Sequence, residues 1–194
     1  EQYVSAEEIF SEYAYFSSYS DSWLEHASRY TDMIVGRLGL DRRSSVMELA
    51  SNDGNLLQYF VQKGIKVLGV EPAANVAAAA EKKGVPTVVK FFGCETAREL
   101  AAQHGQVDLL IGNNVLAQVP DLNDFVGGMK TVLKPRGVIT LEFPHLMRLM
   151  SENQFDTIYH EHFSYFSLLT AVQIFAAQRL RIFDVEELWT HGGS

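Results

Sequence analysis

Residues 45–54 read Ser45-Val46-Met47-Glu48-Leu49-Ala50-Ser51-Asn52-Asp53-Gly54, an apolar run that ends in small and polar residues. The apolar run predicts a buried β-strand, and the polar end predicts a tight turn. Its spacing is that of an acidic residue followed by a Gly-x-Gly-x-Gly turn, with Ala50 and Asn52 at two of the glycine positions. Such a turn lets backbone N–H groups face a ligand. The acidic Glu48 and Asp53 favour a cationic or zwitterionic ligand over a pyrophosphate, which weighs against NAD.

Short apolar runs alternate with helical patterns along the rest of the chain. This alternation predicts an α/β fold with a Rossmann-like, doubly wound, mostly parallel sheet. The further predicted strands cover residues 66–70, 87–89, 107–112, 138–143 and 181–185, and residues 134–137 predict a turn into the fifth strand. The predicted helices cover residues 56–63, 73–83 and 121–133, and an earlier helix runs from the N-cap Ser20 to about Leu38.

The chain is long enough for one substantial core, because 194 residues that are 47% hydrophobic and 21% charged suit a single α/β domain. Residues 1–40 are predicted to form an N-terminal helical lid over the mouth of the sheet. Residues 41–194 are predicted to form the ligand-binding core. No strand is predicted after residue 185, so we expect the C-terminal part of the fold to be truncated.

Charge and composition indicate which classes of partner the chain can bind. The formal net charge is −8 and no Lys/Arg stripe interrupts it, so we expect no nucleic-acid partner. No apolar stretch reaches the ~20 residues that cross a bilayer, and the sequence does not begin with a basic and then apolar leader. We therefore expect no membrane partner and a cytoplasmic location. The lone Cys94 cannot form an internal disulfide or a Cys-rich zinc site, and its setting predicts an ordinary helix entry.

Ligands of such sheets bind at the carboxyl ends of the strands, where two candidate sites follow. Glu71 lies seventeen residues after Gly54. That is near the spacing of about 20 residues at which a carboxylate accepts both ribose hydroxyls of an adenosine. Its alternative role is a helix N-terminal charge, since Pro72 can start the next helix. After the fourth strand, Asn113 and Asn114 form an amide pair that suits an adenine, an amino-acid moiety or simply a turn.

The acceptor side is predicted from two later stretches. The fifth strand runs into Glu142-Phe143-Pro144-His145, so His145 is a candidate substrate-binding residue whose alternative role is to cap the next helix. The run Ile158-Tyr159-His160-Glu161-His162-Phe163-Ser164-Tyr165-Phe166 brings two imidazoles, a carboxylate and two phenols close together. Such a cluster can supply a proton acceptor, a proton donor and a charge within one site.

Two other roles compete for His160 and His162. Residues two apart on a strand share a face, so this pair can ligate a metal, but no third ligand follows within the expected few residues. The aromatic neighbours can also be core packing, with both histidines satisfying backbone groups. The acid–base role is favoured over both.

These residues together resemble the class I S-adenosylmethionine-dependent methyltransferases, and more closely the nucleotide-sugar C-methyltransferases of deoxysugar biosynthesis. The resemblance covers nearly the whole chain and is carried by the order and spacing of short motifs. The motifs are Tyr15-Phe16-Ser17-Ser18-Tyr19-Ser20 with Trp23-Leu24-Glu25-His26-Ala27, Glu48 through Gly54, Gly69-Val70-Glu71-Pro72, Asn113-Asn114-Val115-Leu116-Ala117, and Tyr159-His160-Glu161-His162.

The resemblance implies S-adenosyl-L-methionine as donor, S-adenosyl-L-homocysteine as product and a nucleotide sugar as acceptor, with no metal in this chain. It implies that Glu71 binds the donor ribose and that the turn from Glu48 to Gly54 holds the methionine part. Phe16 with Ser18 is implied to close over the donor. The predicted cofactor-binding set is Phe16, Ser18, Glu48, Ser51, Asn52, Asp53, Gly54, Glu71, Pro72, Asn113 and Asn114.

The resemblance also implies that His162 is the catalytic base, with Tyr159 nearby. Chemistry gives an independent reason, because the methyl of a sulfonium is already electrophilic and methylation of carbon mainly requires a carbanion. Deprotonation next to a ketone needs a base and a donor to the developing oxyanion, which His162 and Tyr159 can supply. Glu161 is predicted to orient an imidazole or hold a sugar hydroxyl, and His160 to do either or to face solvent. Gln118 stands where the family often has a His, so it is assigned no role.

The leading hypothesis is therefore an enzyme that deprotonates a nucleotide-linked keto-deoxysugar α to its ketone and methylates that carbon. The alternatives are an O- or N-methyltransferase on another small molecule and a non-catalytic adenosine-binding module. A nicotinamide-dependent oxidoreductase is disfavoured by the missing glycines.

Overall fold

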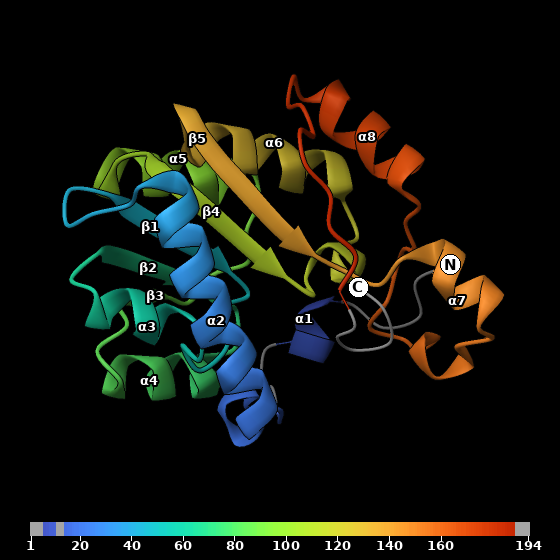
Figure 1. Cartoon of the computed structure of the whole chain (residues 1–194), viewed down its shortest axis with the longest axis horizontal. Helices are drawn as coiled ribbons and strands as arrows, with labels where there is room; N and C mark the ends of the chain where they lie inside the picture. Colours follow the sequence, from blue (N-terminus) through green and yellow to red (C-terminus); the bar gives the residue numbers. More distant parts are fainter. Residues whose placement is uncertain (1–5, 11–13, 189–194) are drawn as a thin grey trace.

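A computed structural model of the chain describes residues 6–10 and 14–188. Its centre is a five-stranded sheet in the order β3-β2-β1-β4-β5 (Figure 1). Every pair of neighbouring strands is parallel, as predicted for a doubly wound fold. The strands are β1 (Ser45–Leu49), β2 (Lys66–Val70), β3 (Thr87–Val88), β4 (Val107–Asn113) and β5 (Leu133–Glu142).

Helices cover both faces of the sheet. On one face α2, α3 and α4 pack around Phe60, Val67 and Leu109. On the other face α5, α6 and α8 pack around Met47, Leu110 and Met129. The α-helices are α1 (Ala6–Phe10), α2 (Asp21–Leu38), α3 (Leu57–Gln62), α4 (Ala74–Lys82), α5 (Cys94–His104), α6 (Leu122–Val132), α7 (Leu146–Ser151) and α8 (Leu168–Ala177), and the 3-10 helices are η1 (Ser17–Tyr19), η2 (Leu116–Gln118) and η3 (Phe155–Thr157).

Most predicted elements are confirmed to within a residue or two. The strands β1 and β2 have the predicted bounds, and Ser20 is the N-cap of α2, with Oγ accepting the N–H of Trp23 at 3.4 Å. The strand β5 begins at Leu133, earlier than predicted. Its register with β4 jumps, because Val107 pairs with Leu133 but Leu109 with Val138. The predicted turn residues therefore form an irregularity within β5.

The sixth predicted strand, residues 181–185, is wrong, because the structure assigns no strand there. This part of the chain is attached by side chains. Ile182 packs against the core, and Arg37 pairs with Asp184 and with Glu186 at 3.2 Å. Of the apolar residues in this range only Ile182 is partly buried, whereas Phe183 and Val185 are exposed. An apolar run alone therefore did not predict a paired strand here.

The predicted N-terminal lid, residues 1–40, includes residues 1–5 and 11–13, which lie outside the described part of the chain, as do residues 189–194 of the predicted core. Within the lid, α2 buries Ala27, Thr31 and Ile34 and crosses in front of the sheet in Figure 1. Only its first turns reach the cavity described below. Whether this segment opens and closes stays a prediction.

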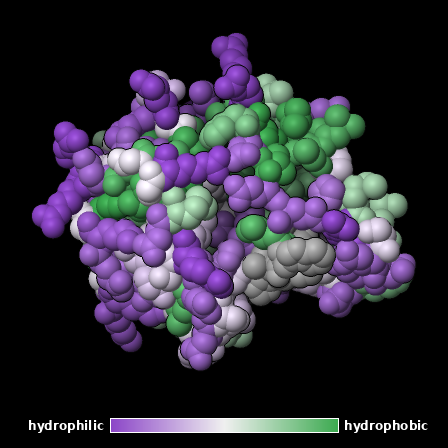
Figure 2. Space-filling model, viewed as in Figure 1, coloured by the Kyte–Doolittle hydropathy of each residue, from purple (hydrophilic) through white to green (hydrophobic). Residues whose placement is uncertain are grey.

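The surface is largely hydrophilic over α2, whereas apolar side chains gather over α8 (Figure 2). On α8, Leu168, Leu169 and Val172 are exposed. No helix in the described ranges is both long and apolar enough to cross a membrane.

Close packing between β2 and the turn after β1 leads to a stability prediction. A Cβ added at Gly69 would lie 2.4 Å from the buried Ser51 Oγ and 2.9 Å from Thr87 Oγ1. Gly69→Ala is therefore expected to destabilise the protein by about 1–3 kcal/mol, measured by denaturant unfolding. In a Ser51→Ala background the loss should shrink, because the nearest clashing atom is gone. Equal losses in both backgrounds would contradict this account.

Candidate active site

A cavity of about 930 Å³ opens at the carboxyl ends of the strands. Its wall takes Glu48 from β1, Val70 from β2, Asn113 from β4 and Pro144 from the segment after β5. This is where ligands bind in doubly wound sheets. The predicted site residues that line it are Glu48, Asn52, Glu71, Pro72, Asn113, Asn114, Tyr159 and His162.

The tight turn predicted after β1 is confirmed. The backbone is left-handed at Ala50 (φ 53°), Asn52 (φ 47°) and Gly54 (φ 73°), the three positions where the motif asks for glycine. An alanine in this conformation is strained, whereas asparagine and glycine adopt it more readily. The turn is therefore built without two of its usual glycines.

Asn52 joins the turn to the N-terminal segment. Its Oδ1 accepts the N–H of Ser17 at 3.0 Å, and its Nδ2 donates to the carbonyl of Tyr15 at 3.0 Å. Its own backbone N–H donates to Glu71 Oε2 at 2.9 Å. One residue thus fixes residues 15–17 beside the cavity and contacts the carboxylate predicted to bind ribose.

Glu71 is buried at the cavity wall, with 5% of its surface exposed. Besides Asn52, its carboxylate accepts the N–H of Ala73 at 2.9 Å. Burial raises the pKa of Glu71, and the two backbone N–H donors act in the opposite direction. Each carboxylate oxygen keeps a further lone pair. Glu71 can therefore still accept hydroxyl groups of a ligand.

Glu48 is a buried acidic residue of the site. The residue is 4% exposed, and its Oε2 has no hydrogen-bond partner among the described residues. Burial raises its pKa well above the ordinary value, and the charges of Glu71 and Asp53 raise it further. A buried carboxylate without a partner is unfavourable unless a cation approaches it. The wall around Glu48 therefore suits a positively charged group.

Replacing Glu48 by Gln is expected to raise the melting temperature of the ligand-free protein, and to do so more at pH 8 than at pH 5. Because the folded-state pKa is raised, the wild-type protein is fully stabilised below the ordinary value of 4.5 and loses that stability as the pH rises through the folded-state pKa. Glutamine does not titrate. Melting curves at both pH values test this, with the exposed Glu81→Gln on α4 as control. A pH-independent difference would count against it.

Several residues that were predicted to bind the methyl donor do not line the cavity. Asp53 pairs with Lys83 at 2.9 Å, and Lys83 also donates to Ser18. Phe16 stacks on Tyr19, with ring centroids 5.3 Å apart. Of the predicted cofactor-binding residues, Phe16, Ser18, Ser51, Asp53 and Gly54 do not line the cavity. They shape the turn and the segment over it, and direct contact with a donor stays a prediction for them.

His162 and Tyr159 lie together at the acceptor side of the wall, with ring centroids 4.2 Å apart. The Nδ1 of His162 is 2.9 Å from the carbonyl oxygen of Thr157. A carbonyl only accepts, so Nδ1 carries the proton and Nε2 has a free lone pair in the neutral ring. Burial raises the pKa of Tyr159, followed by the charge of Glu161, so its hydroxyl stays a donor.

The structure does not bring the other acceptor-side candidates to the wall. His160 is exposed in a turn, Glu161 is half-buried, and His145 precedes α7 without a side-chain cap bond. The two histidines of the run thus do not share a strand face. The described residues contain no cluster of three or more metal-ligating side chains. Conversely Gln118, which sequence reasoning left without a role, lines the cavity.

Sequence reasoning missed the side-chain contact between His26 and Glu142. His26 Nε2 lies 3.1 Å from Glu142 Oε2, and the His26 ring stacks on Trp23, 5.0 Å between centroids. His26 and Trp23 both line the cavity. The available signal was that His26 falls on the same helical face as the apolar Tyr30 and Ile34.

Comparisons with known proteins identify the family. The family model described as "Methyltransferase domain" matches residues 23–183. C-methyltransferase NovU of Streptomyces niveus is 39% identical over 191 residues, which are 98% of this chain and 46% of that protein. A ubiquinone biosynthesis O-methyltransferase of Rhodopseudomonas palustris is 27% identical over 50% of this chain and 38% of its own length. The chain thus spans less than half the length of either relative.

A solved structure shows the same fold. A SAM-dependent methyltransferase from Archaeoglobus fulgidus superposes with a TM-score of 0.65 at 17% identity, covering 80% of this chain and 68% of that one. The shared architecture is the Rossmann-like sheet of class I methyltransferases, which was predicted from the sequence.

Proposed function

The chain belongs to the methyltransferase-domain family, and on that basis we propose that it transfers methyl from S-adenosyl-L-methionine to a carbon of a nucleotide-linked keto-deoxysugar. The observation that carries the proposal is one cavity with buried carboxylates at one part of its wall and an imidazole with a free Nε2 at another. A cationic donor suits the first part, and a carbon-bound acidic proton suits the second.

The donor side of the cavity fits S-adenosylmethionine. The buried carboxylate of Glu48, whose Oε2 has no partner among the described residues, suits its positively charged groups, and Glu71 has lone pairs for two ribose hydroxyls. Asn113 and Asn114 offer amides at the neighbouring strand end. When bound, this donor supplies an electrophilic methyl that an acceptor carbon takes as S-adenosylhomocysteine leaves.

The acceptor side supplies the base. In the proposed step His162 Nε2 takes the proton from the carbon next to the ketone, and the electron pair of that C–H bond becomes an enolate. The hydroxyl of Tyr159, which stays protonated, donates to the enolate oxygen. The carbonyl re-forms when the carbon is methylated, and the proton on His162 is released to solvent.

A nucleotide keto sugar is proposed because it offers an acidic C–H next to a ketone. The relative that matches nearly this whole chain is named a C-methyltransferase, which supports carbon over oxygen as the methylated atom. The resemblance of the short motifs to deoxysugar enzymes supports the sugar.

The test is mass spectrometry of a panel of nucleotide 4-keto sugars incubated with S-adenosylmethionine and the full-length protein. A product heavier by one methyl, with the label on carbon, is expected. Thermal shift with S-adenosylhomocysteine and with NAD runs in parallel, and only the former should stabilise the protein. Stabilisation by NAD alone would refute the donor. Binding of S-adenosylhomocysteine without methylation of any keto sugar would favour an O- or N-acceptor or a binding module.

A further inference from the structure

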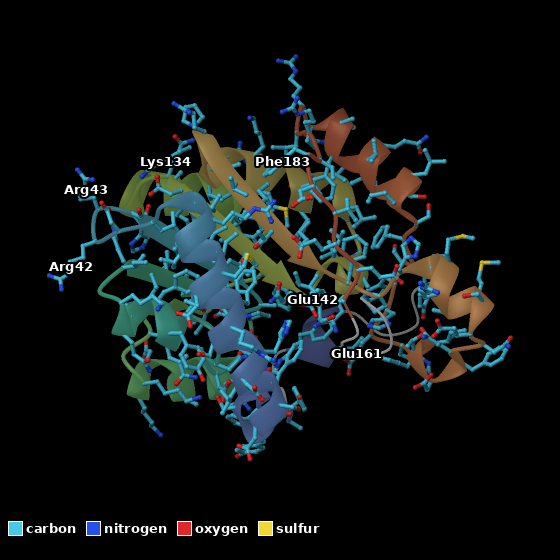
Figure 3. All side chains as sticks on the ribbon, in the orientation of Figure 1. Arg42, Arg43, Lys134, Glu142, Glu161 and Phe183 are labelled. Carbon is cyan, nitrogen blue, oxygen red and sulfur yellow. The ribbon has the colours of Figure 1, made fainter. Side chains whose placement is uncertain are left out.

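His26 lines the cavity and is paired with Glu142, which lies behind it and does not line the cavity. His26 comes from α2 and Glu142 is the last residue of β5, at the tip of the β5 arrow in Figure 3. Their side chains are 18% and 9% exposed. A carboxylate only accepts, so the Nε2 of His26 donates to it, and Nδ1 is the ring atom that remains for a ligand.

The position of His26 is fixed by a second contact one helical turn along. Tyr30 OH lies 2.5 Å from Thr140 Oγ1, and both polar contacts join α2 to the same face of β5. His26 and Tyr30 are four residues apart on the helix, and their partners are two residues apart on the strand. Both separations correspond to about 6 Å, so the two contacts can form side by side. Trp23 stacks on the His26 ring with an interplanar angle of 10°. The imidazole is thus held from both its edge and its face.

The cavity wall, within the described ranges, contains two imidazoles, and they have different partners. His162 is held by a neutral carbonyl and has a free Nε2, which suits a base. His26 is held by a carboxylate, which balances the charge of the ring when both its nitrogens are protonated. Enolisation of a ketone needs both a base for the carbon-bound proton and a donor to the oxygen.

We propose that His26, protonated on both ring nitrogens and oriented by Glu142, is a catalytic proton donor that gives its Nδ1 proton or hydrogen bond to the carbonyl oxygen of the acceptor while His162 removes the neighbouring carbon-bound proton. This rests on the proposed function. The C–H bond breaks, its proton goes to His162, and the electron pair moves to the oxygen, which His26 and Tyr159 then share. When the carbonyl re-forms upon methyl transfer, the proton returns to His26. Glu142 is a positioning residue.

Deuterium wash-in at the acceptor carbon separates this role from donor binding, because exchange needs no S-adenosylmethionine. His26→Gln places its amide nitrogen where Nε2 was, so it keeps the bond to Glu142 but has no atom at Nδ1. We expect exchange on a nucleotide keto sugar to fall about 100-fold or more, with the Kd for S-adenosylhomocysteine within twofold of wild type. His26→Asn keeps a donor near Nδ1 and should retain more exchange. The exposed His104→Gln is the control.

Glu142→Gln tests the positioning residue. Its amide oxygen can still accept from Nε2 but carries no charge to balance a doubly protonated ring. Exchange is expected to fall about tenfold and kcat to fall with it, while KM changes little.

Each other outcome overturns something specific. If deuterium exchange in His26→Gln stays within threefold of the wild-type rate, His26 is not the proton donor, and the proposed function stands. If exchange persists but methyl transfer is lost, His26 positions the methyl donor instead, which also refutes the inference. If the wild-type protein binds S-adenosylhomocysteine but exchanges no keto sugar, the proposed acceptor itself is wrong.

Discussion

Glu71→Ala is expected to weaken binding of S-adenosylhomocysteine by at least about 100-fold, which corresponds to roughly 3 kcal/mol. In the proposed site, two ribose hydroxyls of the ligand would lose their hydrogen-bond acceptor. The carboxylate also accepts the backbone N–H groups of Asn52 and Ala73, and removing it leaves these buried donors without their partner. A fall in the melting temperature should therefore accompany the loss of affinity. Calorimetric titration at a temperature where the variant is folded measures the affinity itself.

Glu71→Gln separates binding from folding. Glutamine has the same length but only one accepting oxygen, so it can serve one backbone N–H or one hydroxyl in place of several. An intermediate affinity is expected, with a smaller loss of stability than in Glu71→Ala. Glu81→Gln, on the exposed side of α4, should leave both quantities unchanged. Unaltered affinity in both Glu71 variants would remove Glu71 from the donor site.

His162→Asn is expected to lower methyl transfer by about 10²- to 10⁴-fold. Asparagine places a donor near the position of Nδ1, so the hydrogen bond to the carbonyl of Thr157 can be kept while the basic Nε2 is removed. The affinity for S-adenosylhomocysteine should stay within twofold of wild type, because Glu48 and Glu71, the carboxylates proposed to bind it, are unchanged. Single-turnover methylation and deuterium wash-in should fall together. Exchange at the wild-type rate would show that another group is the base.

The sheet was predictable because its central strands leave short, mainly apolar runs in the sequence. The strands β1 and β2, buried on both faces, were predicted at their observed bounds. Residues 181–185 show the limit of this reasoning. Their apolar residues favour a strand, and Ile182 packs against the core, but the structure assigns no strand to this segment. Pairing is a property of two segments, and one segment cannot reveal it.

The site residues were predictable where they lie at or just after the carboxyl end of a strand, and they were not predictable elsewhere. Glu48, Glu71 and Asn113 all line the cavity, because the carboxyl ends of parallel strands meet at one edge. His26 lies on a helix before the sheet, and its contact with Glu142 spans 116 residues. His160 and Glu161 were predicted from their nearness in sequence to His162, but they lie in a turn and do not line the cavity.

The turn after β1 has a consequence for how relatives of this protein can be recognised. Its three left-handed residues are an alanine, an asparagine and a glycine, separated by residues of negative φ. A sequence pattern that requires glycine at all three positions does not match Ala50 and Asn52. A pattern written in the sign of the dihedral angle, positive at 50, 52 and 54 and negative between them, would match it as well as it matches a glycine-rich turn. The turn requires a backbone whose φ alternates in sign, and glycine is the residue that most readily adopts the positive values.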